Sequence, residues 1–171
     1  MRNLLASMLS GVALSGFLLC GVAHADDNIG IVTPKCFIHA ANVNHISVSI
    51  LAALMKTEGG RSGMTRLNKN GSHDLGVMQV NDRTWVPKIA RQYFGGDTSA
   101  AYATIRDNGC YNVMVGASIF STYLDESGGD YMKAIGYYNS HTPYYMQKYQ
   151  NTVMSKYMYV YNVFRSHHVV N

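Results

Sequence analysis

A nearly continuous apolar stretch that ends in a glutamate places the strongest constraint on the fold. Residues 47–60 are SVSILAALMKTEGG, and a helix formed by this stretch would carry apolar side chains on every face. A helix that is apolar all round is a buried one. Ser47 offers an N-cap, and Gly59 and Gly60 end the helix because glycine accepts the left-handed conformation. The sequence therefore predicts a buried helix ending at Glu58.

Glu58 is one of two glutamates in the chain, and its position has chemical consequences. Burial raises the pKa of a carboxyl group because the ionised form loses water. The partial negative charge at a helix C-terminus acts in the same direction. A carboxyl that stays protonated near neutral pH is suited to general acid catalysis. The alternative is a solvated residue in the last turn, where a negative charge is disfavoured.

The first residues resemble a signal for export. Arg2 is followed by an apolar run over residues 4–22 and by Ala23-His24-Ala25, a small-x-small pattern typical of signal-peptidase sites. A retained membrane anchor is the alternative, since the run is nearly long enough to span a bilayer. The polar residues that follow favour cleavage after Ala25. We therefore predict a signal peptide over residues 1–25, one domain over residues 26–171 and no stable membrane span after cleavage.

The cysteines and the charge agree with export. Cys36 and Cys110 are the two cysteines outside the predicted signal peptide, and an oxidising compartment favours one disulfide between them. Two separate buried thiols are the alternative. The formal net charge of +4 suits an anionic polymer such as a cell-wall glycan with its peptide carboxylates. No run of Lys and Arg is dense enough to predict binding to nucleic acid.

The rest of the chain reads as a series of short helices around one small β element. Asn70-Gly71 is a tight-turn signal and predicts a small hairpin between residues 61 and 81. Apolar spacing, caps and breakers predict further helices over residues 36–44, 81 or 84 to about 94, 99–107, 113–124, 130–138 and 143 to about 157. The fold class is thus α+β and mainly α-helical. The Tyr-rich tail over residues 157–171 either covers the domain or binds a partner.

Four segments in order resemble the lysozyme-like lytic transglycosylases. The resemblance is to small exported members that accompany conjugation, type III secretion and type IV pilus machines, and it covers about residues 36–155. The segments are Cys36 with the helix ending in Glu58, DLGVMQVN (residues 74–81), NGCYNV with GA after it (residues 108–117), and AIGYYNS with TP behind it (residues 134–143).

The resemblance implies a lysozyme-like domain with a small β-hairpin beside the active-site cleft. It implies cleavage of the β-1,4 bond between N-acetylmuramic acid and N-acetylglucosamine in peptidoglycan, with Glu58 as the single catalytic acid and base and a 1,6-anhydro product. The expected substrate-binding residues are Gly76 for close backbone approach to the glycan, Met78 and Gln79 as cleft walls, Tyr138 with its hydroxyl against the Glu58 carboxyl, and Asn139 on the glycan or its loop. Plain core packing is the alternative for Met78.

Two positions depart from the family pattern, and the number of carboxylates stays open. Gly59 stands where the family usually has serine after the catalytic glutamate, so a hydroxyl is missing there. His141 stands where a glycine is usual, and we interpret it as a surface histidine rather than part of the cleft rim. Most glycosidases use two carboxyl groups. Neither Asp74 nor Asp82 is excluded as a second acid by the sequence.

Other functional classes fit less well. The histidines have no ligand spacing, so we expect neither a metal site nor a cofactor. A Cys–His nucleophile would compete with the disulfide. A water-using muramidase and a catalytically weak peptidoglycan-binding assembly protein stay as alternatives. The expected location is the periplasm, with peptidoglycan strands as substrate and components of a secretion, conjugation or pilus machine as candidate partners.

Overall fold

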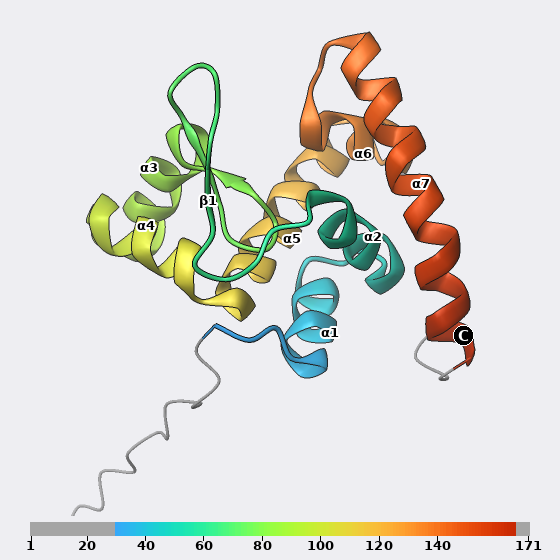
Figure 1. Ribbon diagram of the computed structural model, residues 1–171, viewed down its shortest axis with the longest axis horizontal. Coiled ribbons are helices and arrows are strands. Elements are labelled where there is room, and N and C mark those ends of the chain that lie inside the picture. The colour runs from blue at the N-terminus through green and yellow to red at the C-terminus, as the bar shows by residue number, and fades with distance from the viewer. Residues whose placement is uncertain (1–29, 167–171) are drawn as a thin grey trace, which may run out of the picture.

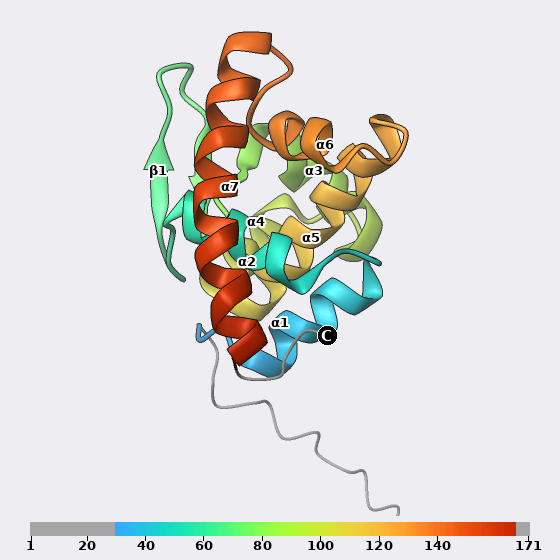
Figure 2. The same ribbon diagram turned by 90° about the vertical axis from the view of Figure 1, so that its right-hand side faces the viewer.

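The computed structural model describes residues 30–166, which form a mainly helical domain with a small antiparallel sheet at one side (Figures 1 and 2). The predicted signal peptide lies outside the described residues, and so does the C-terminal segment 167–171. The helices are α1 (Pro34–Val43), α2 (Val48–Glu58), α3 (Asp82–Tyr93), α4 (Thr98–Asp107), α5 (Gly109–Glu126), α6 (Tyr131–Asn139) and α7 (Pro143–Ser166). The mainly helical α+β prediction is confirmed.

The sheet has three short strands in the order β1-β2-β3. These are β1 (Thr65–Leu67), β2 (His73–Leu75) and β3 (Val80–Asn81). Arg66 pairs with Asp74 across the first hairpin, and Leu75 pairs with Val80 across the second. The predicted turn lies between β1 and β2, where Gly71 has a φ of 77° that suits glycine. The sequence predicted the first hairpin, and the two-residue strand β3 is an addition.

Helix α2 is buried as its composition requires. Its N-cap is Ser47, whose side chain accepts a hydrogen bond from the Ile50 amide, and Leu51 and Leu54 are fully buried. Gly59 closes the helix at a φ of 62°, in the left-handed region. Helix α7 packs along α2, and Figures 1 and 2 show the two side by side. Glu58 is therefore held at the end of an element that cannot shift without disturbing the core.

Two helices differ in length from the sequence expectation. Helix α5 begins at Gly109 rather than at Val113, because the Asn108 side chain caps it by accepting a hydrogen bond from the Tyr111 amide. Helix α7 continues to Ser166 rather than ending near Tyr157. Val160 is buried in this extension. The part of the Tyr-rich tail that the structure describes, residues 157–166, therefore packs on the domain.

No single helix within residues 30–166 has the length and hydropathy needed to cross a membrane. Helices α1 and α2 meet those two criteria only as a pair, and they bend by 116° where they join.

The predicted disulfide is present between Cys36 and Cys110. It joins α1 to the first turn of α5, with the two Cα atoms 5.6 Å apart. The bridge spans 74 residues of sequence and so limits the unfolded chain strongly. It also fixes one end of α5, the helix that contacts α1, α4 and α6.

Removal of this bridge should lower the stability of the fold. Replacing both Cys36 and Cys110 with alanine should reduce the free energy of unfolding by about 4 kcal/mol in the chain-entropy description. Urea denaturation followed by circular dichroism measures the change. Reducing the wild-type protein should give a similar loss, whereas reduction of the double variant should have no effect. Equal stability of variant and wild type would contradict the prediction.

Candidate active site

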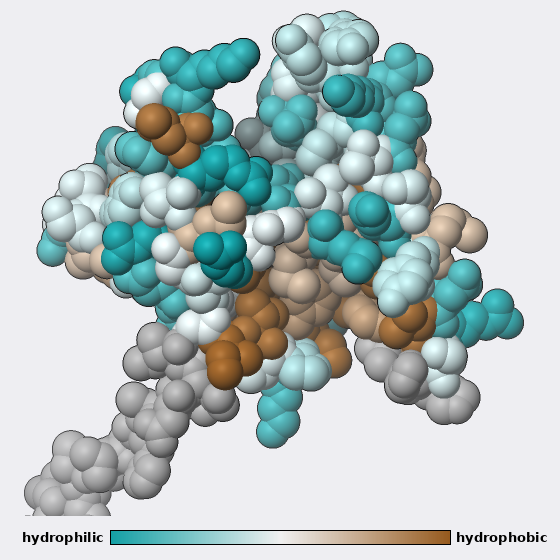
Figure 3. All heavy atoms as spheres, in the orientation of Figure 1, coloured by the Kyte–Doolittle hydropathy of each residue, from teal (hydrophilic) through white to brown (hydrophobic). Residues whose placement is uncertain are grey.

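Glu58 lies in a cleft between the β1–β2 hairpin and the end of α6. This hollow, called the Glu58 cleft below, has a volume of about 420 Å³. Its lining includes Asn68 and Asn70 of the hairpin, Asp74, Gln79, Trp85 of α3, Tyr123 of α5, and Tyr137, Tyr138, Asn139 and His141. Figure 3 shows the notch between the hairpin and the α6–α7 end, flanked by largely hydrophilic surface. A polar, aromatic-lined cleft of this kind suits a carbohydrate chain.

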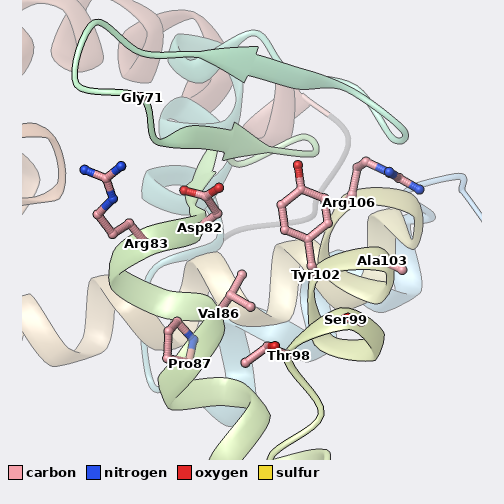
Figure 4. A pocket seen from close by; sticks show the side chains of 10 residues that line it. All are labelled: Gly71, Asp82, Arg83, Val86, Pro87, Thr98, Ser99, Tyr102, Ala103 and Arg106. Atoms are coloured by element: carbon pink, nitrogen blue, oxygen red, sulfur yellow. The ribbon is translucent and has the colours of Figure 1, made fainter.

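A larger hollow of about 670 Å³ lies between α3 and α4 and does not contain Glu58. Figure 4 shows Asp82 and Tyr102 inside it, with Arg83 and Arg106 directed away from each other at its two ends. Asp82 is engaged with the His73 ring, Nδ1 to Oδ2 3.0 Å. Arg106 is engaged in the same way by Asp107 at 2.7 Å. Asp82 and Arg106 are thus already paired within the protein, and Arg83 Nη1 donates a hydrogen bond to the Asn70 carbonyl at 3.1 Å.

The surroundings of Glu58 raise its pKa from 4.5 to about 7. Desolvation by burial is the largest cause, and the nearby charge of Asp74 acts in the same direction. A hydrogen bond from Tyr149 and the charge of Arg66 act against it. The Glu58 carboxyl can therefore change its protonation state near neutral pH, so one side chain can both donate and accept a proton there.

The tyrosine that contacts Glu58 is Tyr149 of α7, not Tyr138. The Tyr149 hydroxyl donates a short hydrogen bond to Glu58 Oε1. The Tyr138 hydroxyl instead donates to the Met78 carbonyl at 3.2 Å, so its predicted contact with the Glu58 carboxyl is not formed. Tyr138 still lines the Glu58 cleft. Burial raises the pKa of Tyr149, which keeps its hydroxyl protonated as the donor.

Sequence reasoning missed Tyr149 because its partner is 91 residues away. A weak signal did exist in the helical spacing. Tyr149, Val153 and Val160 are the buried positions of α7, and they follow one face of the helix. A tyrosine on a buried stripe needs a partner for its hydroxyl. That reasoning would have identified Tyr149 as a buried donor, although not its acceptor.

The Met78 side chain, and the direction that a side chain at Gly76 would take, face the protein interior rather than the cleft. Gly76 has a φ of 68°, and a Cβ there would lie 2.4 Å from Asn112 Nδ2. Met78 is fully buried and its side chain lies against Gly116 of α5. The predicted role of Met78 as a cleft wall is therefore corrected, whereas the approach of glycan to the Gly76 backbone stays a prediction. Gly76 and Met78 both belong to the turn that carries Gln79. The Met78 side chain packs in the core.

Asn112 holds that turn in place from beneath. It is fully buried on α5, and its Oδ1 accepts a hydrogen bond from the Met78 amide at 2.7 Å. Its Nδ2 donates to the Leu75 carbonyl at 2.9 Å and to the Ile105 carbonyl at 2.8 Å. One side chain thus fixes the β2–β3 connection against α4 and α5. Asn112 belongs to the NGCYNV segment of the family resemblance, which predicted no role for this residue.

Gln79 and Asn139 both lie where the sequence predicted, in the lining of the Glu58 cleft. Gln79 has a φ of 50°, and its Nε2 donates to the Gly76 carbonyl at 2.7 Å. Its Oε1 is buried and has no hydrogen-bond partner among the described residues. A buried acceptor without a partner is rare in folded proteins. The Gln79 oxygen is thus an acceptor at the cleft wall whose hydrogen-bonding capacity is not used by the described residues.

An aromatic rim bounds the cleft on the α5–α6 side. Tyr137 and His141 stack with ring centroids 4.0 Å apart, and Trp85 meets Tyr123 edge to face at 6.2 Å. The His141 ring also pairs with Glu126 at 2.9 Å. His141 is therefore part of the cleft rim as well as exposed, which corrects its interpretation as a surface histidine only. Aromatic faces of this kind pack against sugar rings.

The sequence profile of one protein family matches most of the chain. The family is described as Transglycosylase SLT domain, and the match covers residues 35–160. The chain belongs to this family. SLT domains are lytic transglycosylases, enzymes that act on peptidoglycan. Because peptidoglycan lies outside the cytoplasm, this substrate implies an extracytoplasmic location. No curated protein matches the chain significantly.

Asp74 is the second carboxyl group in the Glu58 cleft of this SLT domain, and its charge raises the pKa of Glu58. It lines the same cleft, and its Oδ1 accepts a hydrogen bond from Asn81 Nδ2 at 2.9 Å. Asp82 faces the hollow between α3 and α4 instead and is paired with His73. Of the two acids left open by the sequence, only Asp74 is placed to influence Glu58.

Within residues 30–166, no group of three His, Cys, Asp or Glu side chains could hold a metal ion.

Gly59 in this SLT domain is explained by backbone geometry. Its φ of 62° lies in the region that glycine adopts without strain. A Cβ at Gly59 would meet no described atom within 4 Å, so a side chain there would extend into open space. Helix α2 is therefore ended by glycine at a low conformational cost, and the Glu58 carboxyl keeps its hydrogen bond from Tyr149.

Replacing Tyr149 with phenylalanine should shift the pH profile of the enzyme. The Tyr149 hydrogen bond stabilises ionised Glu58, so its loss should raise the pKa of that carboxyl. The alkaline limb of the pH profile of kcat/KM should then move to higher pH, because Glu58 stays protonated up to a higher pH. The maximal rate should fall roughly tenfold as the carboxyl loses its positioning contact. Tyr144→Phe, at an exposed position of the same helix, is the control. An unchanged or acid-shifted limb would contradict the prediction.

Proposed function

We propose that this protein is a lytic transglycosylase that cleaves the β-1,4 bond between N-acetylmuramic acid and N-acetylglucosamine and forms a 1,6-anhydro product. The observation that carries the proposal is the state of Glu58. Its carboxyl has a pKa of about 7, accepts a hydrogen bond from Tyr149 and opens into a polar, aromatic-lined cleft. A single residue with these properties can serve as acid and then as base.

In the first step, protonated Glu58 transfers its proton to the glycosidic oxygen, and the bond from that oxygen to C1 of the muramic acid breaks. The Tyr149 hydrogen bond stabilises the carboxylate that forms. Positive charge develops at C1. The N-acetyl group of the substrate can stabilise this charge by a substrate-assisted route, which requires no second carboxylate on the enzyme.

In the second step, ionised Glu58 takes the proton from the C6 hydroxyl of the same muramic acid. The C6 oxygen bonds to C1, the 1,6-anhydro ring closes and Glu58 is protonated again. Gln79 and Asn139 line the cleft in which the sugar would lie, and they supply amide groups to its wall. Burial is the main cause of the raised pKa of Glu58, and the charge of Asp74 adds to it.

Product analysis tests the proposal directly. Purified peptidoglycan sacculi are digested with the wild-type protein and with Glu58→Gln, and the soluble fragments are identified by mass spectrometry. The proposal expects anhydro-muropeptides, lighter than hydrolysis products by one water, that are absent with the variant. Fragments with reducing ends would identify a water-using muramidase instead. Sedimentation with the wall without fragment release would identify a binding protein.

We further propose that the enzyme is exported by cleavage after Ala25 and opens the periplasmic wall locally for an envelope-spanning machine. The described part of the chain is one small domain, and the sequence resembles exported transglycosylases that accompany such machines. N-terminal sequencing of the exported protein tests the cleavage site. Deletion of the gene should impair assembly of a conjugation, secretion or pilus apparatus and leave cell growth unaffected. Slow growth with an intact apparatus would contradict the local role.

A further inference from the structure

His141 lines the Glu58 cleft from the connection between α6 and α7. Its side chain is 51% exposed, so it stands at the mouth of the cleft rather than at its floor. Within the described residues, no hydrogen bond or ring contact joins it to Glu58 or Tyr149. A ligand that touches His141 therefore does so away from the proton transfer at Glu58.

The imidazole ring of His141 is held in one orientation by two neighbours. It stacks on the Tyr137 ring, with the ring centroids 4.0 Å apart and the ring planes 22° from parallel. Its Nε2 lies 2.9 Å from Glu126 Oε1 at the end of α5, within hydrogen-bonding distance. A side chain that is already ordered loses little conformational entropy when a ligand binds to it. The His141 ring is thus a preorganised surface.

The same ring ends a row of aromatic side chains along one wall of the cleft. Tyr123 of α5 meets the rings of His141 and Tyr137 edge to face, at 5.7 and 6.4 Å. Trp85 of α3 meets Tyr123 at 6.2 Å. All four rings line the Glu58 cleft, and His141 is the most exposed of them. Aromatic faces pack against the apolar faces of sugar rings, so a row of this kind suits a chain of linked sugars.

We propose that His141 binds a sugar of the glycan that is remote from the cleaved bond, and that it thereby gives the enzyme a preference for long strands over short ones. This inference rests on the proposed function, because it takes the glycan strand as the ligand. The ring lies away from the reacting atoms, so it contacts the strand equally before and during the reaction. Such a contact lowers KM and leaves kcat unchanged. Glycine, the usual residue in the family pattern, has no side chain, so this binding surface is particular to this chain.

Two substitutions at His141 test whether the flat ring is what binds. His141→Ala removes the ring, and His141→Phe keeps a ring that can stack on Tyr137. His39→Ala, at an exposed position of α1 outside the cleft lining, is the matched control. On soluble glycan strands we expect His141→Ala to raise KM roughly three- to tenfold at unchanged kcat, and His141→Phe to restore KM to within about twofold of the wild type.

Other kinetic results would contradict this role. The same KM in all four proteins, with fragments still released, would overturn the inference and leave the proposed function in place. An increase of KM in His141→Phe equal to that in His141→Ala would overturn it as well, because the flat ring would then not be the binding group. A fall in kcat at unchanged KM would place His141 in the chemical step instead.

A binding measurement separates this inference from the proposed reaction. Isothermal titration calorimetry on the Glu58→Gln protein compares a hexasaccharide with a disaccharide of β-1,4-linked N-acetylglucosamine. We expect the added His141→Ala substitution to weaken hexasaccharide binding roughly three- to tenfold and to leave disaccharide binding unchanged. Equal hexasaccharide affinity with and without His141, or an equal loss for both oligomers, would overturn the inference. A loss confined to the hexasaccharide would support it even if the wild-type protein released no fragments from sacculi, a result that would contradict the proposed reaction alone.

Discussion

The Glu58→Gln protein should release soluble fragments from peptidoglycan sacculi at a rate reduced roughly 10²- to 10⁴-fold, the usual effect of losing a general acid–base residue. Glutamine has nearly the same shape and can still accept the Tyr149 hydrogen bond. It cannot give a proton to the glycosidic oxygen. The initial rate of fragment release measures the effect. Glu126→Gln is the matched control, because it changes the only other glutamate, which is half-exposed.

The same substitution should stabilise the fold at neutral and alkaline pH. The folded-state pKa of Glu58, about 7, lies above its ordinary value of 4.5, so folding favours the protonated form. The stability associated with that form is fully present below pH 4.5 and is lost as pH rises through about 7. Glutamine stays neutral throughout. Glu58→Gln should therefore gain up to roughly 3 kcal/mol above pH 7 relative to the wild type, and nothing near pH 4.

These two results together separate a catalytic Glu58 from a structural one. A variant that is inactive and less stable than the wild type at pH 8 would indicate that Glu58 supports the fold. A variant that is as active as the wild type would remove Glu58 from the chemistry. The expected combination is lost activity with a stability gain that appears only as pH rises. Urea denaturation at pH 4 and pH 8 measures the second part.

Replacing Asn112 with alanine should produce the largest loss of stability among single side-chain changes near the site. The Asn112 side chain accepts a hydrogen bond from the Met78 backbone amide and donates to the Leu75 and Ile105 backbone carbonyls. Its removal leaves these backbone groups without a side-chain partner inside the protein. Each buried group left unpaired costs about 1–3 kcal/mol, so a total loss of roughly 3–5 kcal/mol in the free energy of unfolding is expected.

Urea denaturation of Asn112→Ala and of a matched surface variant measures this effect. Asn151→Ala changes an exposed asparagine of α7 and should leave stability within about 0.5 kcal/mol of the wild type. Activity of Asn112→Ala should also fall under conditions where the variant is folded, because the turn that carries Gln79 loses its anchor. A loss below about 1 kcal/mol would show that the β2–β3 connection does not depend on Asn112.

The parts of the fold that the sequence predicted well are those set by local chemistry. The buried helix, its Ser47 cap and its end at Gly59 follow from side chains within a few residues of one another. The turn at Gly71 and the disulfide between Cys36 and Cys110 also have local or compositional signals. These features were sufficient to place Glu58 at the end of a core helix.

The direction of individual side chains was harder to predict, because it depends on packing between distant elements. Met78 occupies the space above Gly116, which no pattern within the 74–81 segment indicates. Gly76 faces Asn112 for the same reason. The Glu58 partner is Tyr149 rather than Tyr138 because α7 packs along α2. A motif thus located the site, and long-range packing decided which of its residues enter the cleft.

The most direct measurement is a titration of the Glu58 carboxyl by nuclear magnetic resonance. The chain has two glutamates, so labelling glutamate with ¹³C at the side-chain carboxyl gives two resonances, and the one absent from Glu58→Gln belongs to Glu58. We predict that this resonance titrates with a midpoint near pH 7. A midpoint near the ordinary value of 4.5 would mean that Glu58 is ionised at neutral pH, and it would contradict the assignment of this residue as the acid of the reaction.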